Sequence, residues 1–440
     1  MRTPICDFVK NYIEKNPMRL HMPGHKGVTY LGAEPFDLTE IDGADSLYEA
    51  NGIIAESEKN ASELFGNDTF YSTEGSSQCI RAMLFLALQN AKKEGKRPLV
   101  LAGRNAHKTF LSAAALLDFD VQWLIDENQD SYLSCKIDAQ TLDRALSRRN
   151  ITAVYLTSPD YLGNILDIKT LSEVCKKYST LLIVDNAHGA YLKFLEESKH
   201  PIDLGADLCC DSAHKTLPVL TGGAYLHISN SAPEWMHSGA KNALALFGST
   251  SPSYLILQSL DMANGYIADG YKEKLCEFVK RVEKLKTALA KAGYVLKGDE
   301  PMKIAVKTKS YGYLGEDFAK AMLDKNAVCE FYDKDFAVMM LTPKTDLESL
   351  EKNLLSIPKK TAIPQISPKY YRPERLMSIR EAALSPSMEV PIEKSLGRIL
   401  ATATVGCPPA VPIVTCGERI TAEAIETFRY YGIETCTVVK

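Results

Sequence analysis

With 440 residues, 45% of them hydrophobic and 24% charged, the chain has an ordinary globular composition, which excludes a disordered or fibrous protein. Its net charge of −4 lacks the basic excess of a nucleic-acid-binding protein. Its longest apolar runs, such as residues 82–88, are far shorter than the roughly 20 residues that span a bilayer. The charged N-terminus has no signal-peptide core and the 11 cysteines show no paired spacing, so we expect a cytoplasmic protein of two or three domains with reduced cysteines.

Helical and strand-like patterns alternate between residues 53 and 228. Such alternation predicts an α/β fold with a mostly parallel sheet that helices cover on both faces. The predicted helices are 53–65, 77–91, 107–117, 138–147 and 168–177, and the predicted strands are 98–102, 121–125, 153–157, 181–185, 208–211 and 223–228.

The second half of the chain predicts a smaller α+β domain. One or two long helices are expected over 254–292, followed by strands 302–306, 327–332 and 336–341 and helices 315–325 and 346–355. A proline-rich connector then precedes a last unit with a helix near 422–431. We therefore predict four parts: an arm at 1–52, a large domain at 53–254, a small domain at 255–356, and a connector with a C-terminal domain at 357–440.

The most informative cluster is Ser212-Ala-His-Lys215-Thr216, which directly follows the predicted strand 208–211. In open α/β sheets the carboxyl ends of the strands face the ligand crevice. A lysine held there can act as an amine nucleophile. Taken alone, Lys215 is more simply interpreted as a surface residue of a loop.

Three other signals are each weak alone. Asp185 ends an apolar strand and is suited either to pair with a buried cation or to cap a turn. Gly75-Ser76-Ser77 precedes an apolar helix, so it offers N–H groups, hydroxyls and a helix dipole to a phosphate, or an ordinary serine cap. His107 stands at the start of the next helix, where a lone histidine is more often structural.

Motifs of other site classes are absent. No G-x-G-x-x-G follows a strand, and no P-loop is present. His21 and His25 have a spacing that suits metal ligands on a helix, but Pro23 and Gly24 lie between them. We therefore predict no metal site.

Together the signals occur in one order: phosphate loop, histidine, acidic strand end and Ser-x-His-Lys. This order resembles the pyridoxal-phosphate enzymes of fold type I, the aspartate-aminotransferase-like fold. Over nearly the whole chain, further segments resemble the Orn/Lys/Arg decarboxylase family. These segments are Leu20–Gly27, Asp37–Ile41, Asn105–Lys108, Thr157–Tyr161, Val184–Gly189, Ser212–Thr216, Thr250–Tyr254, Cys407–Pro412 and Cys416–Glu418.

The resemblance implies a role for each matched residue. Lys215 would form a Schiff base with pyridoxal phosphate, and Asp185 would keep the pyridine nitrogen protonated. Ala187 would pack on one face of the ring, and His107 would stack on the other and help to deliver a proton. The implied cofactor-binding residues are Gly75, Ser76, Ser77, His107, Asp185, Ala187, Ser212, His214, Lys215 and Thr250, with Thr250 reaching the phosphate of a neighbouring subunit.

Several positions depart from the family pattern. The departures are Asn186 for a usual Glu, Asp160 for Thr, Glu74 for Asn, Gly222-Gly223 for larger residues, and Ala410 for Gly. The ring-binding residues are unchanged and the pocket rim is not, so the substrate stays open. The chain also resembles a short form without the response-regulator-like N-terminal domain that assembles decamers. We therefore expect a homodimer, or a dimer of dimers, with shared active sites.

The resemblance predicts a decarboxylase that converts arginine, lysine or ornithine to an amine and CO2 in polyamine biosynthesis, with no nucleic-acid or membrane partner. Glu418, Asp42 and Asp45 are candidate partners for the distal cation of the substrate, and each could equally be a solvent-facing carboxylate.

Two alternatives stay open. One is another fold type I enzyme, an aminotransferase or a lyase, because Arg372, Arg375 and Arg380 fall where a residue that binds the substrate carboxylate commonly lies. The other is a non-catalytic protein that binds pyridoxal phosphate. Retention of both Asp185 and Lys215 argues against the second, since a decayed site would lose the Schiff-base lysine readily.

Overall fold

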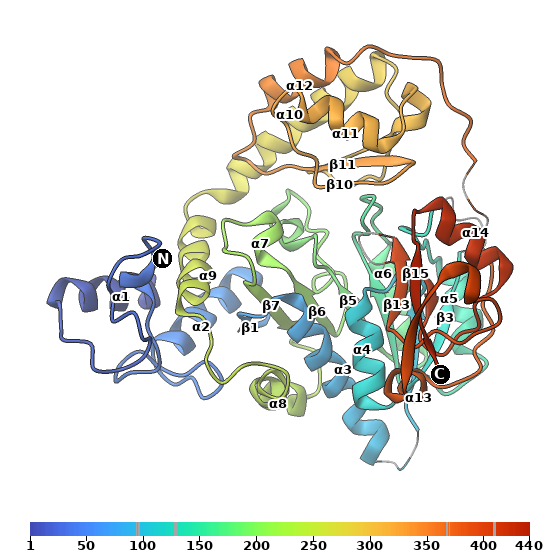
Figure 1. Ribbon diagram of the computed structural model, residues 1–440. Coiled ribbons are helices and arrows are strands. Elements are labelled where there is room, and N and C mark those ends of the chain that lie inside the picture. The colour runs from blue at the N-terminus through green and yellow to red at the C-terminus, as the bar shows by residue number, and fades with distance from the viewer. Residues whose placement is uncertain (94, 96, 127–130, 367, 369, 408–410) are drawn as a thin grey trace. The chain divides into compact units, whose positions relative to one another are not determined.

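The computed structural model describes residues 1–440 except 94, 96, 127–130, 367, 369 and 408–410 (Figure 1). The chain forms two compact units: unit 1 comprises Met1–Lys93 and Ile168–Leu275, and unit 2 comprises Glu94–Asp167 and Cys276–Lys440. The predicted large domain, 53–254, draws residues from both units, and its boundaries remain a prediction. None of the described helices is long and apolar enough to cross a membrane.

Unit 1 is built on strands in the order β1-β7-β6-β5, of which β5 and β6 are parallel and β7 is antiparallel to both β1 and β6. Helix α3 packs against β5, β6 and β7, and α1, α2 and α9 pack together (Figure 1). The helices are α1 (Pro4–Lys15), α2 (Ile53–Phe65), α3 (Gly75–Lys93), α6 (Ile168–Lys177), α7 (Ala213–Thr216), α8 (Glu234–Ala245) and α9 (Tyr254–Ala268), with 3-10 helices at Glu34–Phe36 and Ala190–Phe194. The strands are β1 (Asp68–Ser72), β5 (Leu181–Asp185), β6 (Leu208–Asp211) and β7 (Ala224–Ile228).

Unit 2 contains a parallel set β4-β2-β3, an antiparallel sheet β10-β11-β9-β8, and the antiparallel pairs β12–β15 and β13–β14. The helices are α4 (Lys108–Leu117), α5 (Ala139–Leu146), α11 (Gly315–Leu323), α12 (Leu347–Leu355), α13 (Ile379–Leu384) and α14 (Ala422–Tyr430), with 3-10 helices at Thr308–Tyr311 and Ile392–Lys394; the division between the units falls within α10 (Tyr271–Lys291). The strands are β2 (Leu99–Gly103), β3 (Asp120–Leu124), β4 (Ala153–Thr157), β8 (Leu296–Lys297), β9 (Lys303–Lys307), β10 (Phe331–Tyr332), β11 (Phe336–Met340), β12 (Ser387–Pro391), β13 (Thr404–Cys407), β14 (Val411–Thr415) and β15 (Thr435–Val439).

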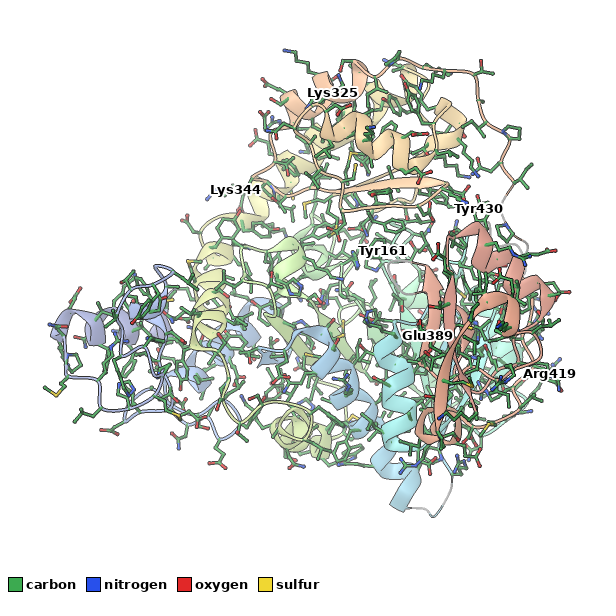
Figure 2. The ribbon with its side chains drawn as sticks, in the orientation of Figure 1. Tyr161, Lys325, Lys344, Glu389, Arg419 and Tyr430 are labelled. Atoms are coloured by element: carbon green, nitrogen blue, oxygen red, sulfur yellow. The ribbon has the colours of Figure 1, made fainter. Side chains whose placement is uncertain are left out.

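Within unit 2, segments far apart in the sequence are joined by packing and by a buried ion pair. Helix α13, near the C-terminus, packs on α4 (Figure 1). Tyr430, labelled in Figure 2, donates to both carboxylate oxygens of Asp335 at 2.8 Å. Lys309 pairs with the same carboxylate at 2.7 Å. These contacts tie α14 to the small antiparallel sheet.

The predicted α/β class with parallel strands is confirmed, and individual elements differ from the prediction. The predicted strand 327–332 is reduced to Phe331–Tyr332, because only these residues pair with β11. The region 254–292 forms two helices, which is one of the two arrangements expected for it, since α9 ends before Asp269 and Gly270 adopts a left-handed backbone (φ +67°). Strand β1, which pairs with β7, was not predicted.

Candidate active site

The carboxyl ends of the parallel strands β5 and β6 carry the main polar groups of unit 1. Asp185, the last residue of β5, is 3% exposed. Its Oδ1 accepts the backbone N–H of Ala187 at 3.2 Å and lies 3.8 Å from the Sγ of Cys210, its register partner on β6. Strand β6 then leads into the short helix α7, which carries Lys215. The strand order therefore brings a buried carboxylate and a lysine to the same edge of the sheet.

Lys215 is hydrogen-bonded to a histidine that the sequence interpretation left without a role. Its Nζ lies 3.0 Å from Nε2 of His188, which is buried. Because an ammonium group has no lone pair, a neutral imidazole must accept its hydrogen bond. The signal for His188 was available in the sequence, since it lies in the family-like segment Val184–Gly189, three residues after Asp185.

A pair of hydroxyl groups meets at the start of α3. The helix begins at Gly75, whose backbone is left-handed (φ +72°) and whose missing Cβ would face open space. Ser212 donates from Oγ to the Oγ of Ser76 at 2.8 Å. The N-terminus of a long helix also offers unpaired N–H groups and the positive end of a dipole. This corner therefore suits a phosphate group.

The departure at Gly222-Gly223 has a structural reason. The carbonyl of Gly222 accepts the N–H of Gly75 at 2.7 Å, and the carbonyl of Gly223 accepts Nδ1 of His214 at 3.0 Å. Gly222 is left-handed (φ +101°), and a Cβ at Gly223 would lie 2.2 Å from the side chain of Val219. In this backbone arrangement a side chain at either position would crowd the connection between the hydroxyl corner and the Lys215 turn.

The donor set fits pyridoxal phosphate, the cofactor that the sequence resemblance implies. The structure supplies an amine at Lys215, a buried carboxylate at Asp185 and hydroxyls at a helix N-terminus. Thr216, next to Lys215, is 4% exposed, and its Oγ1 is buried without a hydrogen-bond partner among the described residues. Such an unsatisfied hydroxyl is costly unless a bound group completes it.

The remaining cofactor candidates lie in three other places. Ala187 is buried just after Asp185, and Ser77 lies in the first turn of α3. Thr250 is exposed in a loop. Glu74, which departs from the family pattern, contacts this loop by accepting the backbone N–H of Ser249.

His107 belongs to unit 2, where it caps α4. Its Nδ1 accepts the N–H of Thr109 at 3.3 Å and lies 2.9 Å from the hydroxyl of that residue. A neutral His107 that accepts through Nδ1 carries its proton on Nε2. Its stacking on a cofactor ring stays a prediction.

Glu418, a candidate partner for the substrate cation, is engaged elsewhere. Its two carboxylate oxygens accept bidentate hydrogen bonds from Arg104 at 2.7 and 2.8 Å, and Oε2 also accepts the N–H of Thr415. Both charged residues are 2% exposed. Burial alone would lower the pKa of Arg104, but the Glu418 carboxylate holds that pKa above its ordinary value. The carboxylate is therefore consumed by an internal ion pair, and we withdraw it as a substrate group.

Removing this pair should cost stability rather than substrate affinity. In a Glu418→Ala variant the guanidinium of Arg104 stays buried without its anion, so we expect a loss of about 3–5 kcal/mol in the free energy of unfolding. Urea unfolding of the purified protein measures this loss. An Arg104→Met/Glu418→Leu double variant, which buries no charge, should recover most of the stability. A stable Glu418→Ala protein with a raised KM would instead restore Glu418 as a substrate group.

The other two candidates for the distal cation differ from each other. Both oxygens of Asp45 accept backbone N–H groups, including those of Gly52 and Ile54 at 2.9 Å, at the start of α2. Partial burial alone would raise the pKa of Asp45, but the backbone N–H groups hold that pKa below its ordinary value. Asp45 therefore satisfies free N–H groups at the start of α2, where Gly52 is the N-cap residue. Asp42 is exposed, and a role in substrate binding stays a prediction for it alone.

Residues that kept alternatives open are also placed within unit 2. Asp160, another departure, is buried and closes its own turn by accepting the N–H groups of Leu162 and Asn164 at 2.9 Å. Two of the arginines considered for a substrate carboxylate donate to backbone carbonyls, Arg375 to Val121 at 2.8 Å and Arg380 to Ala115 at 2.9 Å. Pro408, Pro409 and Ala410, in the segment that resembles the family's C-terminal motif, lie outside the described residues.

Comparison with known proteins shows the family and the fold of the chain. The model of the family described as "Orn/Lys/Arg decarboxylase, major domain" matches residues 3–343. The arginine decarboxylase of Bacillus subtilis strain 168 is 26% identical over 96% of this chain and 92% of its own length, and that of Bacillus anthracis is 26% identical over 97% and 92%. The constitutive lysine decarboxylase of Escherichia coli superposes with a TM-score of 0.80 at 15% identity, covering 100% of this chain and 82% of that one. The last likeness confirms the predicted fold.

Proposed function

Since the chain belongs to the Orn/Lys/Arg decarboxylase family and is a pyridoxal-phosphate-dependent amino-acid decarboxylase, we propose that it removes the α-carboxylate of a basic amino acid, with arginine as the first candidate. The observation that carries the proposal is the convergence of Lys215, His188 and Asp185 at the ends of two parallel strands. Named arginine decarboxylases that match along nearly the whole chain support the choice of arginine.

Each residue of the site has a definite task in this proposal. When bound, pyridoxal phosphate supplies the electron sink for the pair of electrons left behind as CO2 departs. Lys215 provides the amine that holds the cofactor, and His188 accepts and returns the proton of that amine. Asp185, buried and acceptor-only, holds a proton on the ring nitrogen. Ser76, which accepts the hydroxyl of Ser212, would donate its own hydroxyl to the phosphate at the start of α3.

A substrate panel tests the proposal. The purified protein, loaded with pyridoxal phosphate, is incubated with arginine, lysine, ornithine and the uncharged analogue norleucine, and amines and CO2 are measured by mass spectrometry. We expect an amine from arginine and at least a 100-fold lower kcat/KM for norleucine, because a site built for a cation loses its charge-assisted contacts with an uncharged side chain. Release of CO2 without consumption of a keto acid separates decarboxylation from transamination. Equal turnover of norleucine and the basic amino acids would contradict the cationic substrate.

We also propose that the working enzyme is a cytoplasmic homodimer in polyamine biosynthesis, in which each copy covers an apolar surface of the other. An exposed apolar segment at residues 18–31 supports this: Leu20 is 84% exposed and Leu31 94% exposed. Monomeric soluble proteins rarely leave such side chains grouped in water. The exposed loop of Thr250 is the proposed contribution of one copy to the phosphate of its partner.

A Leu20→Asp/Leu31→Asp variant should therefore dissociate. We expect its sedimentation at assay concentration to shift from dimer to monomer and its activity to fall with the fraction of dimer, because two charges enter an apolar contact. Leu396→Asp is the matched control, since Leu396 is 60% exposed in unit 2 and lies outside the proposed contact. A wild-type monomer with full activity would refute the dimer.

A further inference from the structure

A second group of ionisable side chains lies next to Asp185 and is used by no step above. Asp211, the last residue of β6, is fully buried, as are Asn186, His200 and His227. Its Oδ1 accepts the amide Nδ2 of Asn186 at 2.7 Å. Its Oδ2 accepts Nε2 of His200 and Nε2 of His227, both at 3.0 Å. We call these four residues the Asp211 network.

The protonation of the Asp211 network follows from its contacts. Burial alone would raise the pKa of Asp211, but His200 and His227 hold it well below its ordinary value, so the carboxylate is ionised. Burial lowers the pKa of His227, which favours the neutral ring, and its Nε2 faces Oδ2 of Asp211 at hydrogen-bond distance. His200 receives the N–H of Ile202 on Nδ1, which leaves its proton on Nε2. The network therefore places the carboxylate of Asp211 among three donors.

Metal binding is the competing interpretation of the same place. Ligand atoms of His200, Cys209 and Asp211 lie within 4.8 Å of one another. A metal would need the Nε2 lone pairs and a thiolate. Both Nε2 atoms instead face the carboxylate at hydrogen-bond distance, and burial raises the pKa of the Cys209 thiol well above its ordinary value. Hydrogen bonding accounts for the cluster better.

The Asp211 network is joined directly to the candidate site through Asn186. This residue stands between Asp185 and Ala187, and its backbone N–H donates to the carbonyl of Cys210 at 3.0 Å. Its Oδ1 is buried without a partner among the described residues, and a Cβ on Gly189 would lie 2.0 Å from it. Among the described residues, the side-chain amide of Asn186 therefore forms its hydrogen bond through its NH2 group, which donates to Asp211.

We propose that Asn186 and Asp211 are positioning residues that set the height and orientation of the β5 end carrying Asp185 and Ala187, and that the carboxylate at 211 requires a donor at 186. This inference rests on the proposed function, because it assumes that pyridoxal phosphate lies against Asp185. It also explains why this chain departs from glutamate at 186. A carboxylate there would face the buried carboxylate of Asp211 where the amide now donates, and two buried like charges in contact repel strongly.

Exchanging the two side chains tests the pairing. Asn186→Asp should weaken pyridoxal-phosphate binding by the apoprotein at least tenfold, measured by fluorescence titration. The Asn186→Asp/Asp211→Asn double variant should return to within about threefold of wild type. In the double variant the Nδ2 of the new amide takes the place of Oδ1 and donates to residue 186, while its oxygen takes the place of Oδ2 and accepts from both histidines. In Asp211→Asn alone, the amides at 186 and 211 face each other and one carboxylate oxygen is lost as an acceptor. This variant should therefore also bind pyridoxal phosphate more weakly.

Thermal unfolding of the apoproteins separates positioning from stability. Asp207→Asn is the matched control, because Asp207 accepts the N–H of Leu182 at 2.7 Å at the opposite end of the same two strands. It should lower the melting temperature and leave the affinity for pyridoxal phosphate unchanged. In Asn186→Asp the affinity should fall by more than the control predicts from lost stability.

Three results would overturn the inference. The first is an Asn186→Asp protein that binds pyridoxal phosphate as tightly as wild type. The second is a double variant no better than the single ones. The third is stoichiometric metal in purified wild-type protein, measured by elemental analysis and lost in Asp211→Asn. A wild-type protein that binds no pyridoxal phosphate would instead refute the proposed function, and so the two failures are distinguishable.

Discussion

A Lys215→Ala protein is expected to lose turnover by on the order of 10³-fold or more. Lys215 supplies the amine at the strand ends, and Nε2 of His188, 3.0 Å from its Nζ, can accept its proton. Without it no group on α7 can hold the cofactor covalently or exchange with a substrate amine. Borohydride reduction followed by peptide mapping measures the same loss chemically, because the label on wild type should lie at residue 215 and vanish in the variant.

Two further variants show that the effect belongs to this amine. Lys215→Arg keeps a cation beside His188 but cannot form a Schiff base, so it should be as inactive as the alanine variant. Lys193→Ala removes a lysine of the same unit that pairs with Asp203 at 2.6 Å, and it should retain both label and activity. A reduced cofactor that stays attached elsewhere in Lys215→Ala would contradict the assignment.

An Asp185→Asn protein is expected to keep much of its affinity for pyridoxal phosphate and to lose kcat by about 100-fold or more. The carboxylate is 3% exposed, accepts the backbone N–H of Ala187 at 3.2 Å, and lies 3.8 Å from the thiol of Cys210. A buried anion of this kind holds a proton on a facing ring nitrogen far more strongly than an amide does. The difference matters most when negative charge develops on the substrate, so the loss should appear in kcat rather than KM.

The control for Asp185 keeps the strand and changes another carboxylate. Asp207→Asn should leave kcat near wild type, because Asp207 holds the opposite end of β5 through Leu182. Steady-state kinetics on arginine and the visible spectrum of the loaded protein report the two effects separately. An unchanged kcat in Asp185→Asn would show that the carboxylate does not hold the ring proton.

The residue pattern alone locates the chemistry along the chain. Apolar runs such as 181–185 and 208–211 match β5 and β6 residue for residue, since a buried parallel strand is a short continuous apolar segment that ends at a polar residue. These strand ends point to Asp185 and Lys215. Together with the motifs around them, the two residues were sufficient to predict the family and the fold. Local pattern was enough because strand ends and helix starts are local events.

Which polar groups meet depends on how distant segments pack in the folded chain. Glu418 is 314 residues from Arg104, its partner in a buried ion pair, so no local pattern could reveal that its charge is already used. The pairing of Asn186 with Asp211 and of Lys215 with His188 likewise depends on which strands lie side by side. A charged side chain in a sequence is an unassigned donor or acceptor. Its role is settled by the desolvation and hydrogen bonding that burial imposes, and those exist only once the chain has folded.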